Sequence, residues 1–172
     1  TLVRDIKFGL VPNGYSGFDN RPLYNSVDAS LLLFEQIQKY VEYTEDYEFV
    51  KENLYEKLKD VIENYKNGID VDDNNIYLDT DYLIVSGTQN TQNTWMDAKC
   101  NNKAVTPRNG KAVEINSLWY NANEIMAELS LKFGHLISAK KYKELAKKCK
   151  KSFTEKFYNE KTKKFIYRKF KI

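Results

Sequence analysis

Apolar residues recur at helical spacing in four stretches of the chain. The first two stretches cover about residues 26–43 and 47–65, and the second two cover about residues 116–133 and 138–157. Within each stretch the apolar residues follow one another at intervals of three or four, which places them on one face of an amphipathic helix. The pattern therefore predicts four helices whose apolar faces share a core.

The predicted helices are joined by connections of unequal length. About three residues separate 26–43 from 47–65, and about as few separate 116–133 from 138–157. Connections this short make antiparallel helical hairpins. The segments that lead into each hairpin are much longer. Both of them precede the first helix of a hairpin, so they lie at the same end of the array, where we expect a recessed site.

In the long segment between the two hairpins, residues 70–77 followed by 82–85 have the pattern of a turn between short strands, which we predict to be a β-hairpin. Side chains at positions 1, 3, 5 and 12 of this segment also match a calcium-binding loop, namely Asp70, Asp72, Asn74 and Asp81. Position 6 of such a loop is normally Gly, but here it is Asn75, and position 12 is normally Glu. We therefore expect no metal site.

Residues 87–116 bring together side chains that suit a sugar. Two carboxylates, Asp97 and Glu114, lie near Trp95 and Arg108 among many Asn, Gln and Thr residues. Aromatic faces stack on the apolar face of a pyranose, amide and guanidinium groups bond its hydroxyls, and carboxylates catalyse acid–base steps at its acetal carbon. A purely structural loop needs turn residues only. The concentration of these side chains favours a carbohydrate site.

Composition narrows the class of protein. The chain has 172 residues, of which 42% are hydrophobic and 30% are charged, as expected for one globular domain. Two cysteines far apart and a single histidine form neither a disulfide framework nor a metal-ligand motif. The sequence contains no segment with the features of a signal peptide or a membrane span. We expect a cytoplasmic protein without a cofactor and without membrane contact.

The net charge of +3 conceals an asymmetry. Residues 132–172 hold fifteen Lys or Arg and three Glu, a net charge of +12, whereas residues 1–131 hold twelve basic and twenty-one acidic residues. A basic segment of this kind is compatible with nucleic-acid binding. Most of its lysines, however, fall on the polar face of the predicted helix 138–157. A solvated helix face is the favoured interpretation, and we expect no nucleic-acid partner.

Five stretches of the chain, in order, resemble the amylo-α-1,6-glucosidase domain of glycogen debranching enzymes. They are residues 9–13 (GLVPN), 24–30 (YNSVDAS), 94–99 (TWMDAK), 105–110 (VTPRNG) and 113–121 (VEINSLWYN). The resemblance implies an all-α fold, an (α/α)6 toroid in which the first and third predicted helices are inner and their N-termini face the pocket.

The resemblance also implies that residues 1–172 form the central part of one such domain, truncated at both ends. The family's domain has helices before this region and continues beyond it. The alternating segment 165–172, which no later strand follows, agrees with this expectation. A truncated toroid exposes apolar helix faces, so we expect the isolated chain to self-associate.

The reaction implied by the resemblance is hydrolysis of α-1,6-linked glucose branch stubs on glycogen or another α-glucan, with inversion of configuration. Asp97 matches the general acid of the family. Trp95, two residues before it, is expected to form an apolar wall that favours the protonated carboxyl. The family's general base lies in a segment that this chain lacks. We therefore expect the chain to be part of a glycoside hydrolase and to be inactive by itself.

The substrate-binding residues implied by the matching motifs are Asp28, Trp95, Lys99, Arg108, Glu114, Asn116, Trp119 and Asn121. Three of them also have simpler explanations. Asp28 falls in the first turn of a predicted helix, where a carboxylate stabilises the helix dipole. Glu114 precedes another predicted helix and suits a capping role, and Trp119 suits the core. Both explanations stay open for each of the three.

Two other interpretations compete with a debranching glucosidase. One is another α/α-toroid glycosidase, similar to trehalase or glucoamylase, against which the motifs at 94–97 and 105–108 argue. The other is a non-catalytic array of helical hairpins that binds a protein partner. Such a scaffold has no need of a polar, aromatic loop between its hairpins, whereas a sugar site does.

Overall fold

Helices make up about half of the residues that the computed structural model describes, which are 2–101, 103–166 and 168–169. The five α-helices in these residues are α1 (Asp28–Thr44), α2 (Tyr47–Asn53), α3 (Tyr55–Asn67), α4 (Val113–Lys132) and α5 (Leu136–Phe157), and a 3₁₀ helix, η1 (Leu2–Asp5), precedes them. The mainly helical character expected from the sequence is confirmed.

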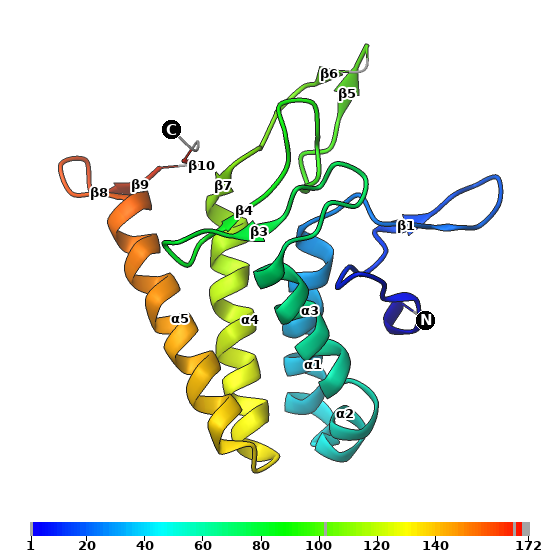
Figure 1. Ribbon diagram of the computed structural model, residues 1–172, viewed down its shortest axis with the longest axis vertical. Coiled ribbons are helices and arrows are strands. Elements are labelled where there is room, and N and C mark those ends of the chain that lie inside the picture. The colour runs from blue at the N-terminus through cyan, green and yellow to red at the C-terminus, as the bar shows by residue number, and fades with distance from the viewer. Residues whose placement is uncertain (1, 102, 167, 170–172) are drawn as a thin grey trace.

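Helices α1 and α4 run side by side in the same direction, and α3 and α5 return antiparallel to them (Figure 1). Gly134, with a φ of +82°, takes the left-handed position in the short turn between α4 and α5. The long segment 68–112 and the segment that leads into α1 lie at the N-terminal ends of α4 and α1, at the top of Figure 1. The prediction that both long loops share one end of the array is confirmed.

The second predicted helix is two helices in the structure. Leu54, with φ −120° and ψ −34°, ends α2 and begins α3. The prediction of one helix over 47–65 is wrong here. The apolar spacing continues unchanged past Leu54 to Leu58, which is fully buried, so the spacing does not reveal the break. The side-chain amide of Asn53 donates to Phe49 O at 3.0 Å. A side chain that bonds a nearby carbonyl in this way competes with the regular helical bond, and periodicity does not reveal it.

Ten short strands form five antiparallel pairs in the described residues. The pairs are β1–β2 (Gly14–Tyr15, Pro22–Leu23), β3–β4 (Tyr77–Leu78, Ile84–Val85), β5–β6 (Lys99–Cys100, Lys103–Ala104), β7–β10 (Lys111–Ala112, Arg168–Lys169) and β8–β9 (Tyr158–Asn159, Lys164–Phe165). The β3–β4 pair is the predicted hairpin. Strands of two residues carry no alternation, so the other four pairs were not predicted.

The segment near the C-terminus pairs with strands that precede it. Strand β9 folds back on β8, and β10 pairs with β7 at the start of α4. The described residues of the alternating segment 165–172 thus have their strand partners earlier in the chain. Residues 167 and 170–172 of that segment lie outside the described residues.

The helices pack around α4, which contacts both α1 and α5. Tyr65 of α3 is fully buried, its ring centroid lies 6.1 Å from that of Trp119 on α4, and its hydroxyl donates to Val27 O at 2.7 Å. Burial raises the pKa of Tyr65, so the phenol retains the proton that it donates. Tyr55 forms a second link, because its hydroxyl and that of Ser130 on α4 are 2.7 Å apart. These contacts fix α3 against α1 and α4.

Helix α5 buries one apolar stripe and exposes its lysines, as predicted. Its buried residues are Ala139, Tyr142, Ala146, Cys149 and Phe157. Burial raises the pKa of Cys149 to about 12, so the thiol is un-ionised. Within the part of the chain that the structure describes, no helix has the length and apolar composition needed to cross a bilayer.

Candidate functional site

A pair of buried asparagines joins three loops at the N-terminal end of α1. Asn74 is 0% and Asn93 is 3% exposed. The side-chain amide of Asn93 donates to both oxygens of Asn74, O at 3.2 Å and Oδ1 at 3.3 Å. Asn74 Nδ2 in turn donates to Tyr24 O at 2.5 Å, and Asn93 O accepts from Val27 N at 2.8 Å. The sequence analysis considered Asn74 only as a calcium ligand and missed Asn93, because their pairing depends on contacts between distant segments.

Gly87 allows the loop to close over this asparagine pair. Its φ is +72°, in the left-handed region that side chains disfavour. A Cβ at this position would lie 2.8 Å from Thr91 Oγ1 and 3.1 Å from Asn93 Oδ1. The amide of Gly87 donates to Asn74 O at 2.6 Å. Both the backbone conformation and the close approach therefore require glycine.

Arg108 and Glu114 form a buried ion pair that supports the loop from the α4 side. The Arg108 side chain is 1% exposed, and it pairs with Glu114 in the first turn of α4. Both carboxylate oxygens of Glu114 are buried. Arg108 Nη1 also approaches Met96 Sδ at 3.8 Å, next to Asp97. The structure thus places these two charged groups against each other beneath the loop rather than at its surface.

Trp95, Asp97 and Lys99 lie at the exposed surface of the loop. Trp95 is 64% exposed, and both Asp97 and Lys99 are exposed. The hairpin β5–β6 begins two residues after Asp97, and Val105 N closes its base by donating to Ala98 O at 2.9 Å. Since Trp95 and Asp97 are both open to solvent, the apolar wall expected beside Asp97 is not formed by the described residues alone.

Asp28 is the first residue of α1 and is partly buried. Its Oδ1 accepts a hydrogen bond from Ser26 Oγ, while Ser26 Oγ accepts one from Ala29 N at 3.2 Å. Ser26 therefore caps the helix through its hydroxyl, although Val27 occupies the N-cap position. The carboxylate lies in the first helical turn, where it also stabilises the positive end of the helix dipole.

Asn116, Trp119 and Asn121 follow one another along α4 but differ in burial. Asn116 is fully buried, and its amide bonds Ile84 N at 2.6 Å, Ile84 O at 3.0 Å and Ala112 O at 3.0 Å. Trp119 is also fully buried, stacked on Tyr65. Asn121 is partly buried. The first two side chains thus belong to the interior, away from the loop surface that carries Asp97.

A cluster of charged side chains links the long segment 68–112 to α5. Lys111 Nζ lies 2.8 Å from Asp79 and 2.6 Å from Asp81, and Lys156 of α5 lies 2.5 Å from Asp81. Burial alone would raise the pKa of Asp81, but hydrogen bonds from the two lysines and from Leu83 N outweigh it and lower that pKa. Burial likewise opposes the charge of Lys111, yet its two carboxylate partners raise its pKa above the ordinary value.

One residue of this cluster, Asp81, is also one of the four positions that matched a calcium-binding loop. Asp81 is engaged by lysines, and Asn74 is engaged by Tyr24 and Asn93. Among the described residues, no group of three or more His, Cys, Asp or Glu side chains is placed to hold a metal ion.

The loops at the N-terminal ends of α1 and α4 gather aromatic, amide and carboxylate groups, which are the groups that bind and hydrolyse a sugar. The model of the amylo-alpha-1,6-glucosidase family matches residues 1–170, and the chain belongs to this family. The resemblance stated from the sequence motifs is thereby confirmed. The family points to a glycosidase of the glycogen-debranching type and to a glucan substrate. Comparison with individual proteins of curated function gives no match.

Proposed function

We propose that this chain contributes the general acid, Asp97, to an active site that hydrolyses α-1,6-linked glucose branch stubs with inversion. The observation that carries the proposal is the contrast between Asp97 and the residues around it. Asp97 is exposed, while Met96 on one side contacts the buried Arg108 and Asn93 is bound to the buried Asn74. A carboxyl that donates a proton to a substrate must be within reach of that substrate and be held in a fixed position.

The reaction needs a second carboxylate. Asp97 protonates the glycosidic oxygen as the bond between that oxygen and the anomeric carbon breaks, and a base removes a proton from the water that attacks the opposite face. In inverting enzymes the two carboxyl groups stand about 6.5–9.5 Å apart. Glu114 is a poor candidate for the base because its oxygens are buried and paired with Arg108. We therefore assign the base to another part of the glucosidase domain.

The proposed architecture of that domain is an (α/α)6 toroid to which residues 1–172 contribute a central part. Support comes from α1 and α4, which lie side by side and parallel with both N-termini at the loop end, as inner helices would (Figure 1). Exposed apolar side chains also lie where α4 turns into α5, namely Leu131, Leu136 and Ile137. In the proposed toroid they contact the neighbouring hairpin; in the isolated chain they promote self-association.

The residues implied in substrate binding divide into two groups. Trp95, Lys99 and Asp28 line or adjoin accessible parts of the loop end and remain candidates for direct contact with the sugar. Asn121, which is partly buried, also remains one. We assign a supporting role to the buried members, Arg108, Glu114, Asn116 and Trp119.

The stereochemistry of the product tests this proposal. Proton NMR recorded during hydrolysis of an α-1,6-branched limit dextrin should show β-glucose first, followed by mutarotation to the α-anomer. First appearance of α-glucose would indicate retention and would rule out the inverting mechanism. Failure of the intact protein to release glucose at all would overturn the assigned reaction.

A further inference from the structure

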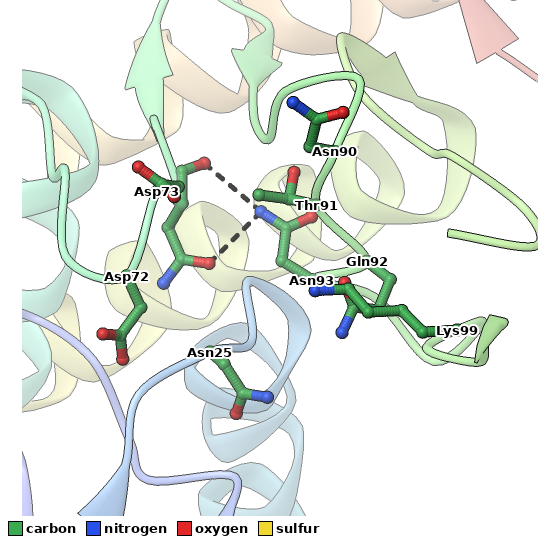
Figure 2. A pocket seen from close by; sticks show the side chains of 9 residues that line it. Asn25, Asp72, Asp73, Asn90, Thr91, Gln92, Asn93 and Lys99 are labelled. Atoms are coloured by element: carbon green, nitrogen blue, oxygen red, sulfur yellow. Dashed lines mark hydrogen bonds between the residues drawn. The ribbon is translucent and has the colours of Figure 1, made fainter. Parts of the chain in front are cut away.

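A polar cleft lies beside the loop that carries Asp97, and nothing so far described assigns it a role. Its volume is about 250 Å³. It is lined by Asn25, Asp72, Asp73, Asn74, Asn90, Thr91, Gln92, Asn93 and Lys99, which come from four separate segments of the chain (Figure 2). We propose that this cleft binds one glucosyl unit of the chain that carries the branch, at a distance from the bond that is cleaved. The inference rests on the proposed function.

The cleft has a fixed floor. Asn74 and Asn93 are buried and hydrogen-bonded to each other, as the dashed lines in Figure 2 show. Their remaining bonds to Tyr24 and Val27 tie the floor to the start of α1. A binding site built on such a network keeps its shape without a ligand, which reduces the entropy lost on binding.

The rim of the cleft offers both kinds of hydrogen-bonding group. Asp72 and Asp73 present carboxylates that accept, Lys99 presents an ammonium group that donates, and Asn90 and Gln92 do both. Each hydroxyl of a sugar is itself a donor and an acceptor, so this mixture is complementary to a ring with several hydroxyls. A purely anionic ligand would be repelled by the two carboxylates.

The volume of the cleft matches a single ring. Pockets that enclose a drug-sized ligand measure about 300–1,000 Å³, so about 250 Å³ leaves room for a smaller group. Among the described residues that line the cleft, none is aromatic. A ring bound here is therefore held by hydrogen bonds along its edge, while the exposed Trp95 remains free to stack on another ring.

The position of Asp97 separates this subsite from the scissile bond. The two rings joined by the cleaved linkage share the oxygen that Asp97 protonates, so both lie against Asp97. Lys99 lines the cleft, but Asp97, two residues before it, does not. We therefore assign a ring in the cleft to a more distant unit of the glucan, so that the cleft contributes to preference for a longer chain.

The inference is tested in the intact protein, which includes the general base, by its preference for a long over a short branched substrate. The quantity measured is the ratio of kcat/KM for a branched limit dextrin to kcat/KM for the smallest branched oligosaccharide that the protein hydrolyses. Asp73→Asn removes one carboxylate, and Asn tolerates the left-handed conformation that Asp73 adopts with φ +58°. Lys99→Met removes the ammonium group and keeps the length of the side chain.

Each variant should lower the preference ratio about tenfold, the effect of losing a hydrogen bond to a charged group. Two matched variants serve as controls, Asp70→Asn and Lys103→Met. Asp70 is an exposed carboxylate near the same turn and Lys103 is an exposed lysine on the same hairpin, and neither lines the cleft. The controls should leave the ratio unchanged.

A ratio that stays at the wild-type value in Asp73→Asn and Lys99→Met overturns the subsite. So does an equal fall of kcat/KM on both substrates, because it places the contact at the scissile bond or reports a general defect. The proposed function fails separately, if the intact wild-type protein cleaves neither substrate or if Asp97→Asn in the intact protein still cleaves them at the wild-type rate. In that case the inference fails with it. Calorimetric titration with an unbranched maltooligosaccharide gives an independent reading, since the variants should bind it more weakly than the controls do.

Discussion

Replacing Arg108 by Met should lower the free energy of unfolding more than a substitution at the surface of the loop end does. Arg108 is 1% exposed and is the ion-pair partner of Glu114, whose oxygens are buried. Removing one partner of a buried ion pair costs about 3–5 kcal/mol because the remaining charge is left without compensation. Glu114 lies in the first turn of α4, where the helix dipole partly compensates its charge, so we expect the lower end of that range, about 3 kcal/mol.

The double variant Arg108→Met/Glu114→Gln separates the ion pair from other effects of the substitution. It removes the stranded carboxylate, so it should be more stable than Arg108→Met alone. With Glu114→Gln measured by itself, the four proteins form a double-mutant cycle that isolates the coupling between the two side chains.

The assay is urea unfolding followed by circular dichroism. With a slope of about 1–3 kcal/mol per molar urea, a loss of about 3 kcal/mol lowers the midpoint by about 1–3 M. The reasoning is refuted if Arg108→Met costs less than about 1 kcal/mol, the value for an ion pair at the surface. It is refuted equally if the double variant is no more stable than the single one.

Two further predictions concern the flanks of the loop. The pKa of Asp81 is lowered in the folded state, so its contribution to stability is present at neutral pH and is lost as the pH falls below about 4. In Asp81→Asn the free energy of unfolding should therefore fall less steeply between neutral and acidic pH than in the wild type. An unchanged pH dependence would contradict this. Gly87→Ala places a methyl group 2.8 Å from Thr91 Oγ1 at a φ of +72° and should cost more than about 1 kcal/mol in thermal unfolding. Gly17→Ala, with nothing within 4 Å of the added Cβ, is its control, and equal losses in both would be inconsistent with the crowding described.

The helices were predictable because each carries a long apolar stripe. Residues 116–133 and 138–157 correspond closely to α4 and α5, and the first predicted helix differs from α1 by about two residues at its start. The break at Leu54 was not predictable, because the stripe runs through it unchanged. Apart from the β3–β4 hairpin, the two-residue strands were not predictable either, since alternation needs more positions.

The roles of the site residues were harder to read than their locations. Arg108 and Glu114 are six positions apart, and only the folded loop brings them into a buried pair. Asn74 and Asn93 are nineteen positions apart, and the sequence gives no sign that their amides meet. Asn116 has the type of side chain that binds sugar hydroxyls, but its amide is hydrogen-bonded to the backbone of residues 84 and 112. Polar residue type predicts that a group must bond something, and the fold decides whether the partner is a substrate or the protein itself.

The most direct measurement is the activity of Asp97→Asn in the intact protein on two substrates. Asn preserves the size of the side chain but has no proton to donate to a leaving oxygen. On an α-1,6-branched limit dextrin, kcat should fall by about 10²–10⁴-fold, the usual contribution of a general acid. On α-glucosyl fluoride, whose leaving group needs no proton, much of the activity should remain. Hydrolysis of the branched dextrin at near the wild-type rate would contradict the assignment of Asp97 as the acid.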